Sequence, residues 1–158
     1  MDISSQSLLL VEDDPEASQA ICLLLKSIGL ANVVAVDSAR DAVKGVVEAS
    51  PTVALIDVNF KPTGGFDLVV SIRRHAPELV RRMPILMFSG QTGPAIEARA
   101  RDAGANAFLA KPFTKHQLKA ALGLVMNDQR KFVTEGDYFG PDRRAPSLQE
   151  EVCSSSKH

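Results

Sequence analysis

Short apolar runs alternate with helical patterns five times within about the first 125 residues of this 158-residue chain. The apolar runs are residues 7–11, 33–36, 52–56, 84–88 and 106–110, and each is followed by a segment with apolar residues at helical spacing. Such alternation predicts a parallel sheet with helices on both faces. Right-handed crossovers leave few topologies, and we expect the doubly wound, flavodoxin-like α/β order 2-1-3-4-5.

The central run, residues 52–56, holds five uncharged and mostly apolar residues and leads directly into Asp57. A short unbroken run of this kind is typical of a strand that is buried on both faces. Its last residue would emerge at the carboxyl end of the sheet, where open α/β folds place their chemistry. Asp57 is therefore the first candidate for a functional residue.

Other strands are expected to deliver polar groups to the same edge. The first run ends in Glu12 and Asp13, and neighbouring strands lie about 4.8 Å apart, so these acids should converge on Asp57. Carboxylates that close repel one another, and a hard divalent cation with oxygen ligands relieves the repulsion; we expect Mg²⁺. Ser89 follows the fourth run and Lys111 the fifth. This set suits a phosphoryl group, with Asp57 as the nucleophile that forms an acyl phosphate.

Each of these residues also has an ordinary structural interpretation. Asp14 and Pro15 are typical of a helix start, and we assign them that role. A single lysine such as Lys111 is usually solvated, and Ser89 before glycine is an ordinary turn. None of these interpretations explains why acids, a hydroxyl and an amine recur at one sheet edge.

In this combination the sequence resembles a bacterial response-regulator receiver domain of the CheY-like type over residues 6–127. The matching features are Glu12-Asp13, Asp57, Gly65, Ser89 and Lys111-Pro112, in order and at the family's spacing. The resemblance implies that Asp57 is the phosphoacceptor and that Ser89 and Lys111 contact the phosphoryl oxygens. It also implies Mg²⁺ binding by the carboxylates of Asp13 and Asp57, by Glu12 through water, and by the backbone carbonyl of Asn59.

Further roles follow from the resemblance alone. Ser89 and Phe108 would be the switch residues, although the family often has tyrosine where Phe108 stands and a hydroxyl-dependent output is then lost. Asn59 and Gln91 occupy the two positions that tune the phosphate lifetime. The peptide bond between Lys111 and Pro112 is expected to be cis.

The implied function is that of a phosphorylation-dependent module in a two-component system or phosphorelay. Its partners would be a sensor histidine kinase or histidine phosphotransfer protein, docking on the first helix and the loop after the fifth strand, and a downstream protein. The output face, which also suits a homodimer, would comprise the helix at 94–103, the strand at 106–110 and the helix that Thr114 begins. The helix at 94–103 places mostly alanines inward, so we expect it to be weakly anchored and to report the state of Asp57.

Two alternatives remain open. One is a small-molecule phosphatase or phosphotransferase that uses an aspartyl phosphate, and the other is a phosphate-independent binding module. Asn59 stands where a second acid would favour the enzyme, and the complete set of acids, serine and lysine disfavours the binding module. We therefore expect no catalysis beyond the chain's own phosphorylation and autodephosphorylation.

The composition of the chain bears on which classes of partner we expect and on its location. The net charge is −1, so we expect no nucleic-acid or membrane partner, and Arg73-Arg74 and Arg81-Arg82 are interpreted as a solvated face. Neither a signal peptide nor a membrane span is recognisable, and Cys22 and Cys153 are expected to be reduced thiols, which indicates a cytoplasmic protein.

Residues 128–158 form a tail that is too short for a separate output domain, so a stand-alone receiver is expected. Its aromatic and basic residues, Tyr138, Phe139, Arg143 and Arg144, are of types common at interfaces. They would dock either on a partner or on the chain's own surface, and the sequence favours neither. The polar, serine-rich residues 146–158 are expected to be disordered.

Overall fold

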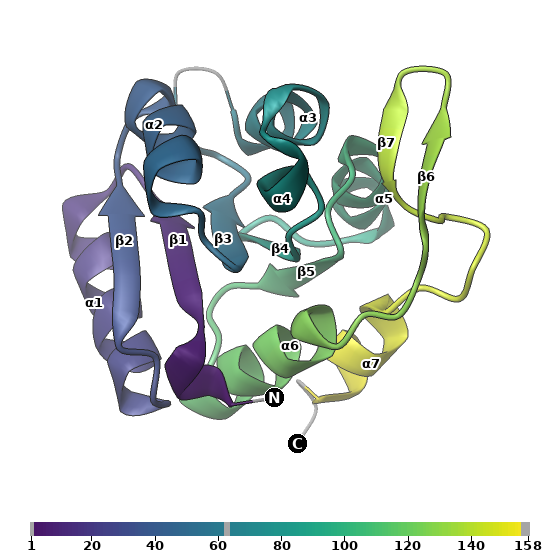
Figure 1. Ribbon diagram of the computed structural model, residues 1–158. Helices are drawn as coiled ribbons and strands as arrows, with labels where there is room; N and C mark the ends of the chain where they lie inside the picture. Colours follow the sequence, from purple (N-terminus) through teal and green to yellow (C-terminus); the bar gives the residue numbers. More distant parts are fainter. Residues whose placement is uncertain (1, 62–63, 156–158) are drawn as a thin grey trace.

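The computed structural model describes residues 2–61 and 64–155, with a five-stranded parallel sheet at its centre (Figure 1). The strands are β1 (Ser7–Val11), β2 (Asn32–Val36), β3 (Val53–Asp57), β4 (Ile85–Ser89) and β5 (Ala107–Ala110). Their order, β2-β1-β3-β4-β5, confirms the predicted topology. Every residue of β3 and β4 is buried, as the unbroken apolar runs predict for central strands.

Helices connect the strands and cover both faces of the sheet. They are α1 (Pro15–Ser27), α2 (Ala39–Ala49), α3 (Gly65–His75), the single turn α4 (Glu78–Arg81), α5 (Pro94–Ala103) and α6 (Lys115–Met126), after a 3₁₀ turn at Ile3–Ser5. The expected caps are present, because Asp14 accepts from the Glu16 N–H and Thr114 forms a capping box with Gln117. The sequence did not predict α4, so the fourth and fifth expected helices are α5 and α6.

Two apolar cores lie on opposite sides of the sheet. One packs β3 and β4 residues such as Ile56 and Met87 against α2, α3 and α5, and it includes Phe108 of β5. The other packs residues such as Leu55 and Phe88 against α1 and α6. The carboxyl ends of the strands lie between these layers, so the side chains that follow them share one edge. Among the described residues, no helix is both long and apolar enough to span a membrane.

The tail is more ordered than the sequence suggested. A hairpin of β6 (Phe132–Glu135) and β7 (Tyr138–Pro141) precedes a final helix, α7 (Gln149–Ser155). The predicted disorder from residue 146 onward is therefore wrong for 149–155. The apolar residue Val152 of this helix is 3% exposed and joins the core beside α6, where Leu148 also packs.

Arg73 is the second correction, because it is buried and not part of a solvated face. Its side chain is 1% exposed, and its guanidinium donates four hydrogen bonds. The acceptors are the carbonyls of Gly104, Arg81 and Met83 and the Oδ1 of Asn106, at 2.7–2.9 Å. Burial lowers the pKa of Arg73 to about 9, which still leaves it charged at neutral pH. The prediction failed because those acceptors come from two segments far from Arg73 in the sequence or in another element, residues 81–83 and residues 104–106.

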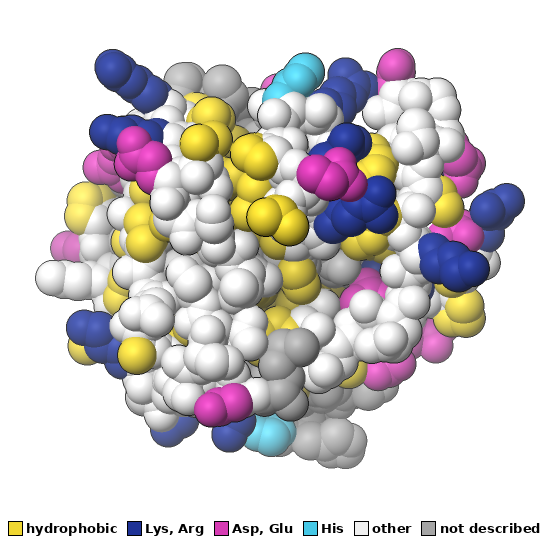
Figure 2. Space-filling view, viewed as in Figure 1, with side chains coloured by type: hydrophobic (Ala, Val, Ile, Leu, Met, Phe, Trp, Pro, Cys, Tyr) yellow, Lys and Arg dark blue, Asp and Glu magenta, His cyan; other side chains and the backbone are white. Residues whose placement is uncertain are grey.

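The hairpin covers this buried arginine. Arg73 lies over the ring of Phe132, 4.8 Å from its centroid, and Arg81 lies over Phe139 at 3.8 Å. Figure 2 shows basic side chains gathered between α4 and the hairpin, with apolar surface beside them. The arginines interpreted as a solvated face thus attach the tail to the domain.

Candidate functional site

Three acids meet where β1 and β3 end. Val11 pairs with Ile56 in the parallel register, so Glu12 and Asp57 leave the two strands side by side. Carboxylate oxygens of Glu12, Asp13 and Asp57 lie within 4.8 Å of one another. Glu12 is 2% exposed and Asp57 5%, whereas Asp13 is half-buried. The predicted convergence of the three acids is confirmed.

The loops after the strands hold each carboxylate through a backbone amide. The Asn59 N–H donates to Asp57 Oδ1 at 3.0 Å, and the Asp14 N–H donates to Glu12 Oε1 at 3.1 Å. Across the site, the Lys61 N–H donates to Asp13 Oδ2 at 3.3 Å. These bonds orient the acids without neutralising them, because each supplies a neutral donor.

Charge at this edge is incompletely compensated. Glu12 Oε2 is buried and has no hydrogen-bond partner among the described residues. Burial, and then the adjacent Asp57 carboxylate, raise the pKa of Glu12 to about 7. A buried oxygen without a donor beside two further carboxylates is the donor set of a hard divalent cation, so the residues fit Mg²⁺.

Lys111 supplies the positive charge that the site does contain. It follows β5, and its Nζ lies 3.5 Å from Glu12 Oε2 and 3.8 Å from Asp57 Oδ2. The ammonium also lies over the Phe88 ring, 4.7 Å from its centroid, a favourable cation–π contact. The bond to Pro112 is cis, as the resemblance implied.

Ser89 ends β4 and is fully buried. Its Oγ accepts from the Gln91 N–H at 3.0 Å and from Asn59 Nδ2 at 3.5 Å. A hydroxyl that accepts still carries its own proton, so Ser89 retains a donor for an incoming oxyanion. The structure thereby groups Ser89 with Asn59 and Gln91, the two residues assigned to lifetime tuning, beside Asp57.

The loop after Asp57 comes unusually close to it at Gly65. This residue donates its N–H to the Val58 carbonyl at 2.9 Å. A Cβ at position 65 would collide with the backbone carbonyl of Asp57. Glycine is therefore required sterically for the loop to fold back over the end of β3.

Phe108, the proposed aromatic switch, is 2% exposed, and its side chain lies in the core that α5 covers. Its backbone is bound by a residue that the sequence analysis missed. Gln149 of α7 accepts from the Phe108 N–H at 3.0 Å and donates to the Phe108 carbonyl at 2.9 Å. No local sequence pattern signals this contact, because it joins residues 41 positions apart.

The tail residues singled out as interface types lie away from the acids. Tyr138 and Phe139 are buried, and the Arg143 guanidinium lies 3.8 Å from the centroid of the Tyr138 ring and 3.2 Å from Asp102 Oδ1. Arg144 is exposed and pairs with its neighbour Asp142. Of the two options left open, the structure shows docking on the chain's own surface for all but Arg144.

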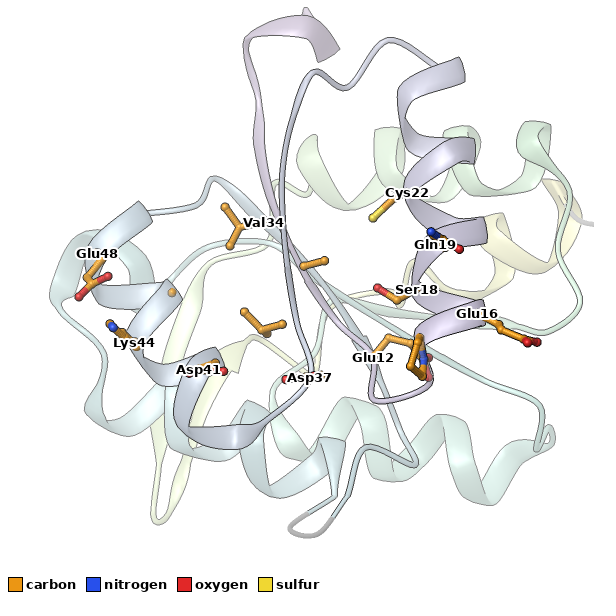
Figure 3. A pocket seen from close by; sticks show the side chains of 14 residues that line it. Glu12, Glu16, Ser18, Gln19, Cys22, Val34, Asp37, Asp41, Lys44 and Glu48 are labelled. Atoms are coloured by element: carbon orange, nitrogen blue, oxygen red, sulfur yellow. The ribbon is translucent and has the colours of Figure 1, made fainter.

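A groove of about 700 Å³ lies between α1, β2 and α2 and reaches Glu12 at one end (Figure 3). Glu16 and Gln19 line it from α1, Lys44 from α2, and Val34 lies in its floor. The groove therefore connects the buried acid to the exposed face of the first helix.

The chain is similar to known proteins over most of its length. The response regulator receiver domain family matches residues 8–123. The transcriptional regulatory protein GltR of Pseudomonas aeruginosa is 30% identical over 138 residues, which are 87% of this chain and 56% of GltR. The cell cycle response regulator CtrA of Brucella ovis is 28% identical over 82% of this chain and 55% of its own length. The chain thus spans about half the length of these relatives.

Solved structures agree with the fold. A response regulator from Chloroflexus aurantiacus superposes with a TM-score of 0.72 at 28% identity, covering 78% of this chain and 98% of its own. The chemotaxis protein CheY4 of Vibrio cholerae gives a TM-score of 0.70 at 28% identity, covering 76% and 98%. With the family match, the sheet order and the cluster of acids together, the chain belongs to the response-regulator receiver family.

Proposed function

We propose that the chain is a phosphorylation-dependent signalling module that accepts a phosphoryl group on Asp57 from a histidine kinase or a histidine phosphotransfer protein. One observation supports this most strongly. Asp57 ends the central strand among two further carboxylates, and the Lys111 ammonium lies within 4 Å of two of the three acids. A phosphoryl group fits this arrangement, because its negative oxygens can bind both the lysine ammonium and a cation held by the three acids.

Mg²⁺ is the cofactor that these residues fit. Asp13 and Asp57 would bind it through their carboxylates, Glu12 through water and Asn59 through its backbone carbonyl. When bound, the cation supplies positive charge that offsets both the acids and the phosphoryl oxygens.

The chain's own residues carry the transfer. An Asp57 Oδ attacks phosphorus as the P–N bond to the donor imidazole breaks, and the bonding electrons leave with the imidazole nitrogen, which takes up a proton. Lys111 pairs with one phosphoryl oxygen and Ser89 donates its hydroxyl proton to another. Water later cleaves the acyl phosphate and regenerates the carboxylate. Asn59 and Gln91, both exposed beside Ser89, are placed to influence how water reaches it.

The state of the site reaches the output face through β5, because β5 belongs to that face and also ends beside the acids. Lys111 continues β5, and Ser89 pairs with Ala110, so movement of either residue toward a phosphoryl group acts on β5. We assign the switch to Ser89 and Phe108 and the output to the face formed by α5, β5 and α6, which is where a downstream partner or a second copy binds. The donor protein docks on α1 and on the loop after β5. The chemistry of the site is limited to the phosphorylation of Asp57 and its autodephosphorylation.

The test is phosphorylation by acetyl phosphate with Mg²⁺, followed by intact mass measurement. The expected result is a single phosphoryl adduct on the wild type. The adduct should be absent from Asp57→Asn and absent when the metal is chelated. Asp14→Asn, which changes an exposed helix cap and not the cluster, is the matched control and should still be modified. A wild type that stays unmodified under these conditions would overturn the proposal.

A further inference from the structure

The sheet has two edge strands, β2 and β5, and they differ in what occupies the outer backbone groups. The outer edge of β2 pairs with no other strand of the described chain, and its residues are largely exposed. At β5, the carboxamide of Gln149 takes the place of a neighbouring strand, because it binds both the N–H and the carbonyl of Phe108. A side-chain amide offers the same donor and acceptor as a peptide group, so this one residue closes the edge at Phe108.

The helix that carries Gln149 packs on the domain mainly through the apolar side chain of Val152. Val152, three residues further on, is 3% exposed and packs in the core with Leu109, Leu118 and Leu122. Leu148 is partly buried at the same core, and α7 as a whole packs against α6 and β5. A seven-residue helix is far too short to be stable in water alone, so α7 is helical because it is docked.

Two pockets border the docked helix where it meets β5. Two cavities, about 240 and 230 Å³ in volume, flank Phe108, and Gln149 lines both. The first opens toward α5 and Arg130, and the second toward Pro112 and Val152. Because α7 is short and is held mainly by Val152, the partly buried Leu148 and the hydrogen bonds of Gln149, it can leave without unfolding the domain.

The strand that α7 binds, β5, also ends beside Asp57. From Phe108 the chain runs three residues to Lys111, whose N–H donates to the Ser89 carbonyl at 2.8 Å and whose ammonium lies 3.8 Å from Asp57. A movement of Lys111 toward a phosphoryl oxygen would be passed to β5 through this backbone connection. Both hydrogen bonds to Gln149 need the two Phe108 backbone groups in one position, so that movement would weaken the docking of α7.

We propose that α7 is an intramolecular occupant of the α5–β5–α6 face. A partner would bind this face by displacing α7 with a short helix that presents a carboxamide and, three residues later, a branched apolar side chain. Phosphorylation of Asp57 shifts the equilibrium toward the undocked helix, a clause that rests on the proposed function. The tail thereby keeps the face closed until the phosphoryl group arrives.

Amide hydrogen exchange on the full chain tests the docking. Val152→Asp should speed exchange in Ala107–Ala110 and in α7 by about tenfold or more, because a buried charge expels the helix. Gln149→Ala, which keeps the apolar anchor, should give a smaller change in the same segments. Glu150→Ala, on the exposed side of the same helix, should change neither. Equal exchange in all four proteins would overturn the proposal.

A peptide supplied separately tests whether the face is a binding site. A fluorescein-labelled peptide of residues 146–155 should bind the Val152→Asp chain about tenfold or more tightly than the wild type, whose own α7 occupies the face. The same peptide carrying Val152→Asp should bind neither protein. Equal affinity of the unmodified peptide for the wild type and the Val152→Asp chain would show that α7 does not occupy its site.

Coupling to Asp57 is tested by repeating the exchange measurement after treatment with acetyl phosphate and Mg²⁺. Faster exchange in α7 of the wild type, but not of Asp57→Asn, is the expected result. An adduct on Asp57 with unchanged exchange in α7 would overturn the coupling and leave the proposed function standing. A wild type with no adduct would overturn the proposed function and the coupling together, while the Val152→Asp comparison still decides the docking.

Discussion

Two regions of this molecule bury charge, and they do so with opposite results. Around Arg73, four acceptors surround one guanidinium, and Asn106 continues the network to Asp128. Around Asp57, three carboxylates share one lysine, and Glu12 Oε2 has no donor among the described residues. The first arrangement is complete and stabilises the fold, whereas the second lacks positive charge and depends on what binds there.

The largest expected effect comes from breaking the complete network. Arg73→Met should lower the free energy of unfolding by about 3–5 kcal/mol, because it removes the donor to three backbone carbonyls and one of the two donors to Asn106 Oδ1. Urea unfolding measures the change. Arg74→Ala, at the exposed neighbour, should change it by about 0.5 kcal/mol or less. Similar losses for the two variants would mean that the network is not stabilising.

At the cluster of acids around Asp57, removing a charge should raise the free energy of unfolding. In the presence of a chelator, Glu12→Gln should raise the free energy of unfolding by about 1–2 kcal/mol, because it removes a repelling charge from beside Asp57. Glu48→Gln, at an exposed helix position, is the control and should have little effect. Destabilisation by Glu12→Gln would contradict the view that this acid is strained.

The change in unfolding free energy caused by Glu12→Gln should also depend on pH. The pKa of Glu12 is about 7 in the folded chain, above its ordinary value of 4.5, so the folded state takes up the proton first. The ionised Glu12 carboxylate therefore destabilises the fold above pH 7, and this destabilisation is relieved as the pH falls toward 5. The gain from Glu12→Gln should therefore be larger at pH 8 than at pH 5. A gain independent of pH would show that Glu12 does not titrate in this range.

Magnesium should remove this strain. At a Mg²⁺ concentration ten times its dissociation constant, the wild type should gain about 1.4 kcal/mol of unfolding free energy. Asp13→Asn should lose most of that gain, because it deletes a proposed carboxylate ligand. Thermal denaturation with and without Mg²⁺ measures the effect. A gain that survives in Asp13→Asn would place the cation elsewhere.

The smallest effect concerns Asp128, at the end of the Arg73 network. Burial alone would raise the pKa of Asp128, but hydrogen bonds from Arg130 and Asn106 lower it below its ordinary value of 3.8. Its stabilisation is thus present above pH 3.8 and is lost as the pH falls below it. Asp128→Asn should cost more stability at pH 6 than at pH 3, and Asp137→Asn, at a 98% exposed side chain, should cost little at either. A cost that does not change with pH would argue against an ionised Asp128.

Sequence reasoning succeeded where the information is local. The apolar runs define the strands, strand order follows from right-handed crossovers, and the order brings Glu12, Asp13 and Asp57 together. Lys111 and Ser89 follow from the same geometry, because parallel strands end at one edge.

It failed where burial depends on distant segments. Arg73 lies four residues after the buried Val69, a helical spacing that places it on the inward side, but its charge favoured the opposite interpretation. Its acceptors come from the α4 turn with the residues just after it and from the loop between α5 and β5, and the hairpin covers it. In the same way, nothing near Gln149 in the sequence indicates Phe108 as its partner.

We expect Asp57 alone to receive the phosphoryl group, and borohydride trapping tests this most directly. Borohydride reduces an acyl phosphate to the alcohol, so an aspartyl phosphate becomes homoserine and can be located by peptide mass mapping. After treatment with acetyl phosphate and Mg²⁺, we expect homoserine at position 57 and nowhere else, and none when Mg²⁺ is chelated. Reduction at position 12 or 13, or no reduced residue in a chain that carries the adduct, would contradict the claim.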